Sequence, residues 1–565
     1  MKEQKEKYNL PKGWLWTTIG DIAILSSGGT PDRGNRSYFK GDIPWVKSGE
    51  LNYNTIVETE ETISQEALES SSAKILPSGT LLIALYGSTV GKLAFLGIDA
   101  ATNQAVAALK TTKSFESKYL YYYLLNNRER LLQKRVGGAQ PNISQKILQI
   151  FPIPLAALYE QRIIVHQIES LFSKLYEAEK GLRTANNSLK TYRQVLLKNA
   201  FEGMLTKNWR KDLPIDAYQE LTEIRRKRKD KYNTEIVNKK EKKIKINFEF
   251  DYKKDNKISS WAVSSLDNLI NINARIGWRG LTKKEYTNEG ALFLSVHSLN
   301  YGKNVVFKDA NFISIERYEE SPEIQLKEND ILLCKDGAGI GKVGIIKKMP
   351  DIATVNSSLL VIDAREVFNP DFLYYFFLGP DMQRLVNEKI SGSAIPHLFQ
   401  KDIKKFKLKV PPILEQDKIV EILESRFTLV DNLEKTIDNV LNEIIALKQS
   451  ILKKAFEGRL VNYTSKESVE KLLNDIQEEK RLYLENQKEL NHSKPRQKKQ
   501  MEQKKSIIDI LKKSDSPISA QELWEKSTSE GDIERFYSEI KEIYYQIDEL
   551  KSKTESLLIL KDENK

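Results

Sequence analysis

The strongest constraint on this fold is that most of the sequence occurs twice, at a spacing of about 250 residues. Gly87-Ser-Thr-Val-Gly-Lys92 returns as Gly337-Ala-Gly-Ile-Gly-Lys342, and Ala200-Phe-Glu-Gly203 returns as Ala455-Phe-Glu-Gly458. Other matches keep the same order: Phe115…Tyr122 with Phe368…Tyr375, and Glu160-Gln161 with Glu415-Gln416. Because solenoid units run to roughly 50 residues, this period indicates duplication of a whole module. Two like modules predict a pseudo-twofold molecule suited to a target with two parts.

The overall composition favours a polyanionic partner without proving one. The net charge is +11 and the pI is about 9.1, as expected of a nucleic-acid-binding chain, although free use of lysine would give the same balance. Cys334 is the only cysteine, so we expect no disulfide framework and a reducing, cytoplasmic setting. No run of about 18 apolar residues occurs, so neither a signal peptide nor a membrane span is expected.

Each copy changes its hydrophobic period partway along. Short strands separated by Gly and Asp turns are predicted at about 10–155, the first module, and 258–412, the second module. A stripe then steps by 4 and 3 residues from Ile164 to Leu196 and recurs 255 residues later, where only Arg426 violates it. An average step of 3.5 residues predicts a coiled-coil seam, and Gly203 and Gly458 are expected to end the helices. The return of the chain between them favours antiparallel pairing.

These patterns predict an α+β fold in which two β-rich domains alternate with two long helices that pair as an antiparallel coiled coil. A small α-rich C-terminal extension follows, with three short helices and a strand near Leu557. That order is compatible with a winged helix-turn-helix or with a plain docking domain. The expected parts are 1–157, first β-rich domain; 158–206, first long helix; 207–257, charged linker; 258–412, second β-rich domain; 413–463, second long helix; 464–505, charged helical arm; and 506–565, small helical domain.

Several motifs look catalytic but fail their own requirements. A phosphate loop needs glycine at Tyr86 and Ser or Thr at Leu93, and the GxGxxG run at Gly339–Gly344 leads into a strand rather than a helix. Both segments are better interpreted as β-hairpin turns. Asn369-Pro-Asp-Phe372 departs from the Asn-Pro-Pro-Phe motif of adenine methyltransferases, and four scattered histidines make no metal set. We therefore predict no catalytic residues, no metal site and no cofactor bound by this chain.

The candidate DNA-contacting residues lie in the early loops and the hairpin turns. Arginine and lysine suit guanine edges and phosphates, so basic loops with interleaved aromatic residues favour DNA over a merely solvated rim. The candidates in the first module are Arg33, Arg36, Tyr38, Lys47, Ser88, Thr89 and Lys92. Those in the second module are Arg275, Trp278, Arg279, Lys283, Lys284, His297, Asp336 and Lys342.

The ordered repeats, the turns, the segment 138–144 and the helix ends resemble the specificity subunit of type I restriction-modification systems, over roughly residues 10–463. This resemblance implies two target-recognition domains, each reading one half of a bipartite double-stranded DNA site. It also implies two methyltransferase subunits and restriction/translocase subunits as partners, which would bind S-adenosylmethionine, ATP and Mg. The second copy departs at Pro396-His-Leu-Phe399, where the first has Pro141-Asn-Ile-Ser144.

Two other functions remain open on sequence alone. One is a stand-alone bipartite DNA-binding regulator, which would not need exposed apolar patches on its helices. The other is a methyltransferase fused to its own reader, against which the altered Asn-Pro-Asp-Phe segment and the missing methyl-donor loop argue.

Overall fold

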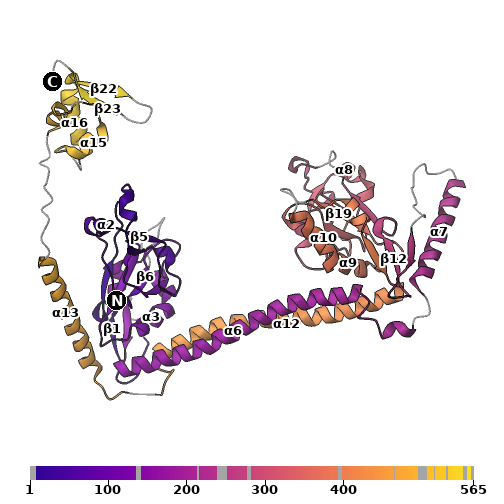
Figure 1. Ribbon diagram of the computed structural model, residues 1–565, viewed down its shortest axis with the longest axis horizontal. Coiled ribbons are helices and arrows are strands. Elements are labelled where there is room, and N and C mark those ends of the chain that lie inside the picture. The colour runs from indigo at the N-terminus through magenta and orange to yellow at the C-terminus, as the bar shows by residue number, and fades with distance from the viewer. Residues whose placement is uncertain are drawn as a thin grey trace. The chain divides into compact units, whose positions relative to one another are not determined.

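The computed structural model describes residues 8–134, 142–212, 216–237, 251–275, 281–391, 397–462, 465–493, 506–514, 516–529, 532–551 and 556–561. They form two compact units (Figure 1). One unit, made of Met1–Trp14, Lys118–Gln133 and Ala156–Lys466, contains both long helices and the second module. The other, made of Leu15–Ser117, Lys134–Leu155 and Glu467–Lys565, contains the sheets of the first module and the C-terminal extension. Among these described residues, no helix is long and apolar enough to cross a membrane.

The first module is built on a five-stranded sheet of order β2-β9-β6-β7-β4 and a three-stranded sheet of order β5-β3-β8. Central strand β6 is buried along its whole length, as its unbroken apolar sequence predicts. The strands are β1 (Leu15–Thr18), β2 (Ala23–Ser27), β3 (Ile43–Val46), β4 (Asn54–Ile56), β5 (Glu61–Ile63), β6 (Leu81–Ala84), β7 (Leu93–Leu96), β8 (Ala101–Thr102), β9 (Val106–Thr111) and β10 (Pro152–Leu155). The helices of this copy are α1 (Ile19–Ile22), η2 (Arg36–Phe39), η3 (Ser48–Glu50), α2 (Gln65–Ser70), α3 (Ser117–Asn126), α4 (Arg128–Gln133) and α5 (Gln145–Gln149).

The second module repeats this plan with sheets of order β13-β19-β16-β17 and β15-β14-β18. Its additional strand β11 extends the pair β12-β20. The strands are β11 (Tyr252–Lys254), β12 (Ala262–Ser265), β13 (Asn271–Ala274), β14 (Ala291–Leu294), β15 (Asn311–Ile313), β16 (Ile331–Cys334), β17 (Val343–Ile345), β18 (Ala353–Val355), β19 (Leu359–Asp363) and β20 (Lys407–Val410). The helices are η5 (Leu266–Asn268), η7 (Lys283–Glu285), η8 (Val296–Leu299), α8 (Ile315–Glu319), η9 (Pro322–Ile324), η10 (Gly337–Gly339), α9 (Pro370–Leu378), α10 (Pro380–Ser391) and α11 (Gln400–Lys404).

The two long helices α6 (Leu158–Phe201) and α12 (Ile413–Phe456) pair as an antiparallel coiled coil, which confirms that prediction. Glu179 contacts Lys448 at 3.0 Å and Arg193 contacts Glu434 at 2.9 Å, so moving forward along α6 moves the partner backward along α12. Adding the 255-residue repeat to Glu179 gives Glu434, and adding it to Arg193 gives Lys448. The two ion pairs are therefore copies of one contact, as at a twofold interface.

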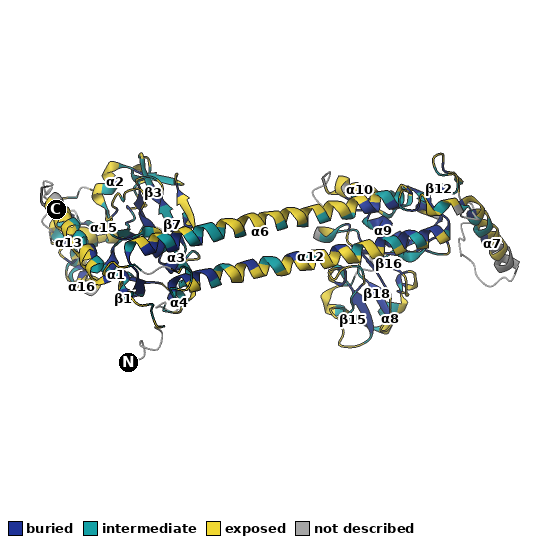
Figure 2. Cartoon of the chain, turned by 90° about the horizontal axis from the view of Figure 1, so that it is seen from below, coloured by how far each residue is buried: buried dark blue, intermediate teal, exposed yellow. Residues whose placement is uncertain are grey.

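The structure confirms one of the two positions per heptad that were predicted to form the seam of the coiled coil. One position per heptad is buried as expected, at Leu423, Val430, Ile437, Ile444 and Ile451. The alternate predicted position is exposed at Arg426, Leu433 and Leu447, although Ile419 is buried and Val440 half-buried. Glu434 and Lys448, which form the polar pairs just described, directly follow Leu433 and Leu447 and face the partner helix instead. Arg426, the apparent exception in the stripe, therefore lies outside the contact. Figure 2 shows both helices buried at their ends and largely exposed between them.

Both long helices end as predicted. Gly203 (φ 74°) and Gly458 (φ 68°) adopt the left-handed conformation that glycine tolerates best. The next amide, of Met204 or Arg459, donates to a carbonyl five residues back at 2.8 Å in each copy. This double use of one helix-ending motif explains the repeated Ala-Phe-Glu-Gly sequence.

The phenylalanine of that sequence anchors each helix end. Phe201 packs edge-on against Phe372 and Phe376 of α9, with ring centroids 5.3 and 5.6 Å apart. Phe456 packs edge-on against Tyr119 and Tyr123 of α3, at 5.1 Å from each. Each long helix thus ends against a helix that belongs to the other copy of the repeat.

Two shorter helices follow the long ones: α7 (Ala217–Val237) after α6, and α13 (Val469–Ser493) after α12. The extension then continues as α14 (Ile507–Lys512), β21 (Ile518–Ser519), α15 (Ala520–Lys526), α16 (Ile533–Ile543), β22 (Ile547–Lys551) and β23 (Ser556–Leu560). Its sheet has the order β21-β23-β22 around a core that includes Leu511, Leu523 and Phe536. Three helices and a three-stranded sheet in this order are compatible with a winged helix-turn-helix, and a plain docking domain stays open as the alternative.

Candidate nucleic-acid interface

The repeated Gly-Lys segments form β-hairpin turns, as predicted. β6 pairs antiparallel with β7, and β16 pairs antiparallel with β17, so each segment connects two neighbouring strands. Gly91 donates to the Ala84 carbonyl at 2.8 Å, and Gly341 donates to the Cys334 carbonyl at 2.9 Å. Because a strand rather than an α-helix follows each turn, neither turn leads into the α-helix N-terminus that holds a phosphate in a nucleotide-binding loop.

The turn lysine has the same partner in both modules. Lys92 Nζ donates to Asn52 Oδ1 at 3.0 Å, and Lys342 Nζ donates to Asn300 Oδ1 at 2.6 Å. The sequence reasoning missed both asparagines, although they lie 248 residues apart, close to the spacing of the lysines. A lysine beside an asparagine combines a phosphate contact with a side chain that suits adenine.

Around the second-module pair, a cleft of about 900 Å³ lies between the hairpin turn and the long helices. Lys342, Asn300 and Arg193 line it together with the acidic side chains Glu424 and Asp431. Lys342 is itself exposed, so its ammonium is reachable from solvent.

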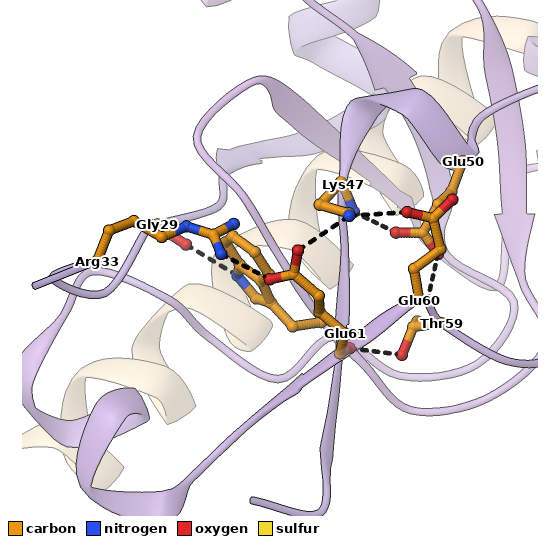
Figure 3. A network of polar contacts seen from close by, with 8 residues as sticks. Gly29, Arg33, Lys47, Glu50, Thr59, Glu60 and Glu61 are labelled. Atoms are coloured by element: carbon orange, nitrogen blue, oxygen red, sulfur yellow. Dashed lines mark hydrogen bonds and ion pairs between the residues drawn. The ribbon is translucent and has the colours of Figure 1, made fainter. Parts of the chain in front are cut away.

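In the first module, two of the predicted cations are held by acidic neighbours (Figure 3). Arg33 contacts Glu61 at 2.7 Å and lies over the rings of Phe39 and Trp45, 4.3 and 5.0 Å from their centroids. Lys47 contacts Glu60 at 2.7 Å and Glu61 at 3.0 Å. The early loop is therefore a charge-balanced network rather than a free basic patch.

The pKa shifts follow these contacts. Hydrogen bonds from Lys47 to Glu60 and Glu61 raise the pKa of Lys47. Burial works to raise the pKa of Glu61, but hydrogen bonds from Lys47 and Arg33 outweigh it, and the pKa lies below its usual value. Burial raises the pKa of Glu50, although the backbone amides of Lys47 and Glu60 donate to it and oppose the shift. Lys47 and Glu61 are thus held in their charged forms.

The remaining first-module candidates differ in accessibility. Arg36 lies exposed on η2, while Tyr38 is half-buried against the cluster around Trp45. Ser88 is exposed and Thr89 half-buried in the hairpin turn. The turn and η2 therefore offer side chains to a ligand more readily than the paired Arg33 and Lys47 do.

In the second module, the placement of Arg275 in an exposed basic loop is wrong. Its side chain is 3 % exposed, Nε donates to the Val355 carbonyl at 3.2 Å, and the guanidinium lies 5.6 Å from the Phe293 ring centroid. Burial lowers its pKa, as does the nearby positive charge of Arg317. Arg275 thus packs inside the module, directly after the end of strand β13 at Ala274.

The other second-module candidates are mostly accessible. Lys283 and Lys284 are exposed on η7, and His297 is exposed on η8. Trp278 and Arg279 lie outside the described residues.

Asp336 has partners that its first-module counterpart Tyr86 lacks. It forms an ion pair with Lys335 and a hydrogen bond with Nδ1 of His397, the residue at which the second copy departs in sequence. The frame around this substitution is kept, since Leu398 donates to the Lys335 carbonyl at 2.9 Å and Ile143 donates to the Leu85 carbonyl at 2.8 Å. The second module therefore has the Asp336–His397 pair, which the first lacks, while both modules share the same backbone hydrogen bond beside it.

Across the described ranges, no group of three or more His, Cys, Asp or Glu side chains could hold a metal ion. Cys334 is buried on β16. The site contains cations, amides and aromatic rings arranged on turns, an arrangement suited to binding.

Comparison with known proteins gives consistent matches. The family described as type I restriction modification DNA specificity domain matches residues 11–185 and 218–443. The EcoKI specificity subunit of Escherichia coli K12 is 24% identical over 466 residues, covering 80% of this chain and 90% of its own length. The MjaIX specificity subunit of Methanocaldococcus jannaschii is 24% identical over 459 residues, covering 80% and 94%.

A solved structure has the same fold. It was determined in work on complex assembly and conformational transition of the type I R-M system, and it aligns with a TM-score of 0.58 at 18% identity. The alignment covers 80% of this chain and the whole of the other.

Proposed function

The chain belongs to the family of type I restriction-modification DNA specificity domains, and on this premise we propose that each of its two modules reads one half of a bipartite DNA target. The chain is a sequence-specific DNA-binding specificity subunit, as the relatives across most of its length are named. The observation that carries the two-part reading is the repeated turn: Lys92 with Asn52 and Lys342 with Asn300. One DNA-facing motif present twice, amid loops that differ, suits two different half-sites.

The coiled coil then acts as a ruler between the half-sites. Each long helix has 44 residues and spans about 66 Å at 1.5 Å per residue. The repeated ion pairs fix the register of the antiparallel pair, so this helical rod formed by α6 and α12 has a fixed length. That length sets the number of base pairs between the two half-sites.

The exposed face of the rod supports a role for partner subunits. Leu429, Leu433, Ile445 and Leu447 of α12 are each about half exposed or more. Large exposed apolar side chains gathered on one element mark a contact surface and argue against a stand-alone regulator. We assign this surface to two methyltransferase subunits, and further contacts to restriction/translocase subunits.

The chemistry then belongs to those partners. S-adenosylmethionine, ATP and Mg would be bound by them, and this chain would contribute only DNA recognition and assembly. Purified alone, the chain should therefore transfer no methyl groups and should support methylation only with a methyltransferase partner.

Exchange of the first module tests the two-part reading. Residues 10–155 are replaced by the corresponding module of another specificity subunit, and the methylated sites are found by sequencing the host DNA. One half of the target should change and the other half should stay. A change in both halves, or in neither, would contradict the proposal.

A further inference from the structure

The helices α7 and α13 occupy equivalent places in the two halves of the chain and share a short sequence pattern. The segment Leu221-Thr-Glu-Ile224 of α7 matches Leu473-Asn-Asp-Ile476 of α13 at a spacing of 252 residues. Each helix follows a long helix. The first residue of each helix, Ala217 in α7 and Val469 in α13, is buried, and these two residues are also 252 positions apart. The duplication therefore extends into the C-terminal arm, beyond the residues that match the family.

The helix α7 is fixed to the second module by a buried arginine. Arg228, whose side chain is 8 % exposed, contacts Glu366 with Nε at 2.5 Å from Oε1. Glu366 lies three residues after the end of β19. At the start of α7, Ala217 donates to the Ser260 carbonyl at 2.9 Å. These contacts hold α7 against the loop that follows the last strand of the main sheet.

The helix α13 is fixed to the first module at the equivalent loop. Glu479 accepts hydrogen bonds from the Lys113 amide at 2.9 Å and the Ser114 hydroxyl at 2.6 Å, just after β9 ends. Lys480, which stands 252 residues after Arg228, donates to the carbonyls of Gly20 and Asp21 in α1, the latter at 3.1 Å. The cation in both copies thus ties the helix to its module.

The contacts of α13 lie at one end of the paired strands β2 and β9. The other end of β2 leads into the early loop that we assign to DNA. β2 follows α1 directly, and it pairs with β9 from Ala23 opposite Thr111 to Ser27 opposite Ala107. Residues after Ser27 form the loop that carries Arg33. A helix that fixes α1 and the end of β9 therefore fixes the base from which that loop projects.

We propose that α7 and α13 are repeated braces, each of which positions one module for reading its own half-site, with Arg228 and Lys480 as the positioning residues. This proposal rests on the proposed function, since it assumes two half-sites. It assigns the charged arm that contains α13 to recognition by the first module.

The test compares fidelity at the two half-sites in complexes assembled with the methyltransferase partner. Methylation rates are measured on DNA carrying the full target and on DNA with one mismatch in either half. Lys480→Ala should reduce discrimination against first-half mismatches about fivefold and leave second-half discrimination within twofold. Arg228→Ala should do the reverse, while Lys480→Arg and Arg228→Lys should retain most of the discrimination.

Arg481→Ala is the matched control, because Arg481 pairs only within α13 in the contacts described, with Glu478 and Glu485. It should change neither half. Should Lys480→Ala fail to fold in thermal melting, Glu479→Gln weakens the same attachment and should give the same first-half effect. Equal changes at both half-sites, or none in a folded variant, would overturn the proposal. Failure of the unmodified chain to direct methylation to any bipartite site would instead overturn the proposed function.

Discussion

In the first module the cations Arg33 and Lys47 are held by Glu60 and Glu61, whereas in the second Arg275 lies in the interior and Lys283 and Lys284 are exposed. The turns below these loops are alike down to single hydrogen bonds. A duplicated frame has therefore kept its backbone contacts while the charge on its early loops was rearranged. The shared residues thus specify how each module is built, while the unshared loop residues give the two modules different charge arrangements.

The largest effect is expected from lengthening the frame that both modules share. One heptad inserted into both long helices, after Asn186 and after Leu441, keeps the seam and adds about 10 Å. These residues lie midway between the two repeated ion pairs, so both halves of the contact are preserved. Sites that remain methylated should have about three more base pairs of spacer, as host methylome sequencing would show. An unchanged spacer in an active variant would mean that the rod does not measure DNA.

The two helix ends should respond unequally to the same substitution. Alanine at either Gly203 or Gly458 costs about 1–2 kcal/mol for the left-handed backbone. At Gly458 its Cβ would lie 2.0 Å from the Pro11 ring, whereas at Gly203 the nearest atom is the mobile tip of Ile258 at 2.4 Å. Gly458→Ala should lower the free energy of unfolding by about 3 kcal/mol, and Gly203→Ala by about half of that, in denaturant titrations. Equal losses would show that Pro11 moves aside freely.

A buried carboxyl distinguishes the second module in its response to pH. Burial raises the pKa of Asp330 to about 6, while the equivalent residue of the first module is the neutral Thr80. Because the folded pKa exceeds the unfolded value, the stabilising effect of protonation is complete below about pH 4 and is lost as the pH rises through 6.

Asp330→Asn should therefore stabilise the protein at pH 7.5 by up to about 3 kcal/mol and have little effect near pH 4. Denaturant titration at the two pH values measures this difference. Thr80→Val serves as the control and should give the same change in stability at both pH values. A stabilisation by Asp330→Asn that did not depend on pH would exclude a titrating carboxyl as its cause.

The smallest effect is expected from the turn lysines, which have the same asparagine partner in both modules. Lys92→Ala and Lys342→Ala should each weaken DNA binding by the assembled complex about tenfold and reduce the salt dependence by about one ion. Lys180→Ala, at an exposed position on α6, removes the same charge as a control. Unchanged affinity in both turn variants would remove the hairpins from the interface.

The repeat made much of this fold predictable. Matching segments such as Gly87–Lys92 and Gly337–Lys342 predicted the hairpins, and the 3.5-residue stripe predicted the coiled coil. The side of the helix that forms the seam could not be predicted, because Glu179 and Arg193 look like surface residues until their partners, 269 and 241 residues further along the chain, are considered.

The candidate site was less predictable for a similar reason. The cations Arg33 and Lys47 stand near Glu60 and Glu61 only after β3 and β5 have paired. The burial of Arg275 could not be predicted because its partners Phe293 and Val355 lie on strands further along the chain. The asparagines that bind the turn lysines, Asn52 and Asn300, are 248 residues apart, whereas the lysines are 250 apart. This small difference is the only sign of the pair in the sequence.

The repeated ion pairs of the rod have a consequence for how such a chain arises. Each half of the chain carries both members of the contact, Glu179 with Arg193 in one helix and Glu434 with Lys448 in the other. A chain with one module and one long helix would therefore meet its own complement in a second copy of itself, since a twofold interface is self-complementary. The present chain holds both halves of such a pair in one polypeptide, and this fusion allows its two modules to differ in sequence.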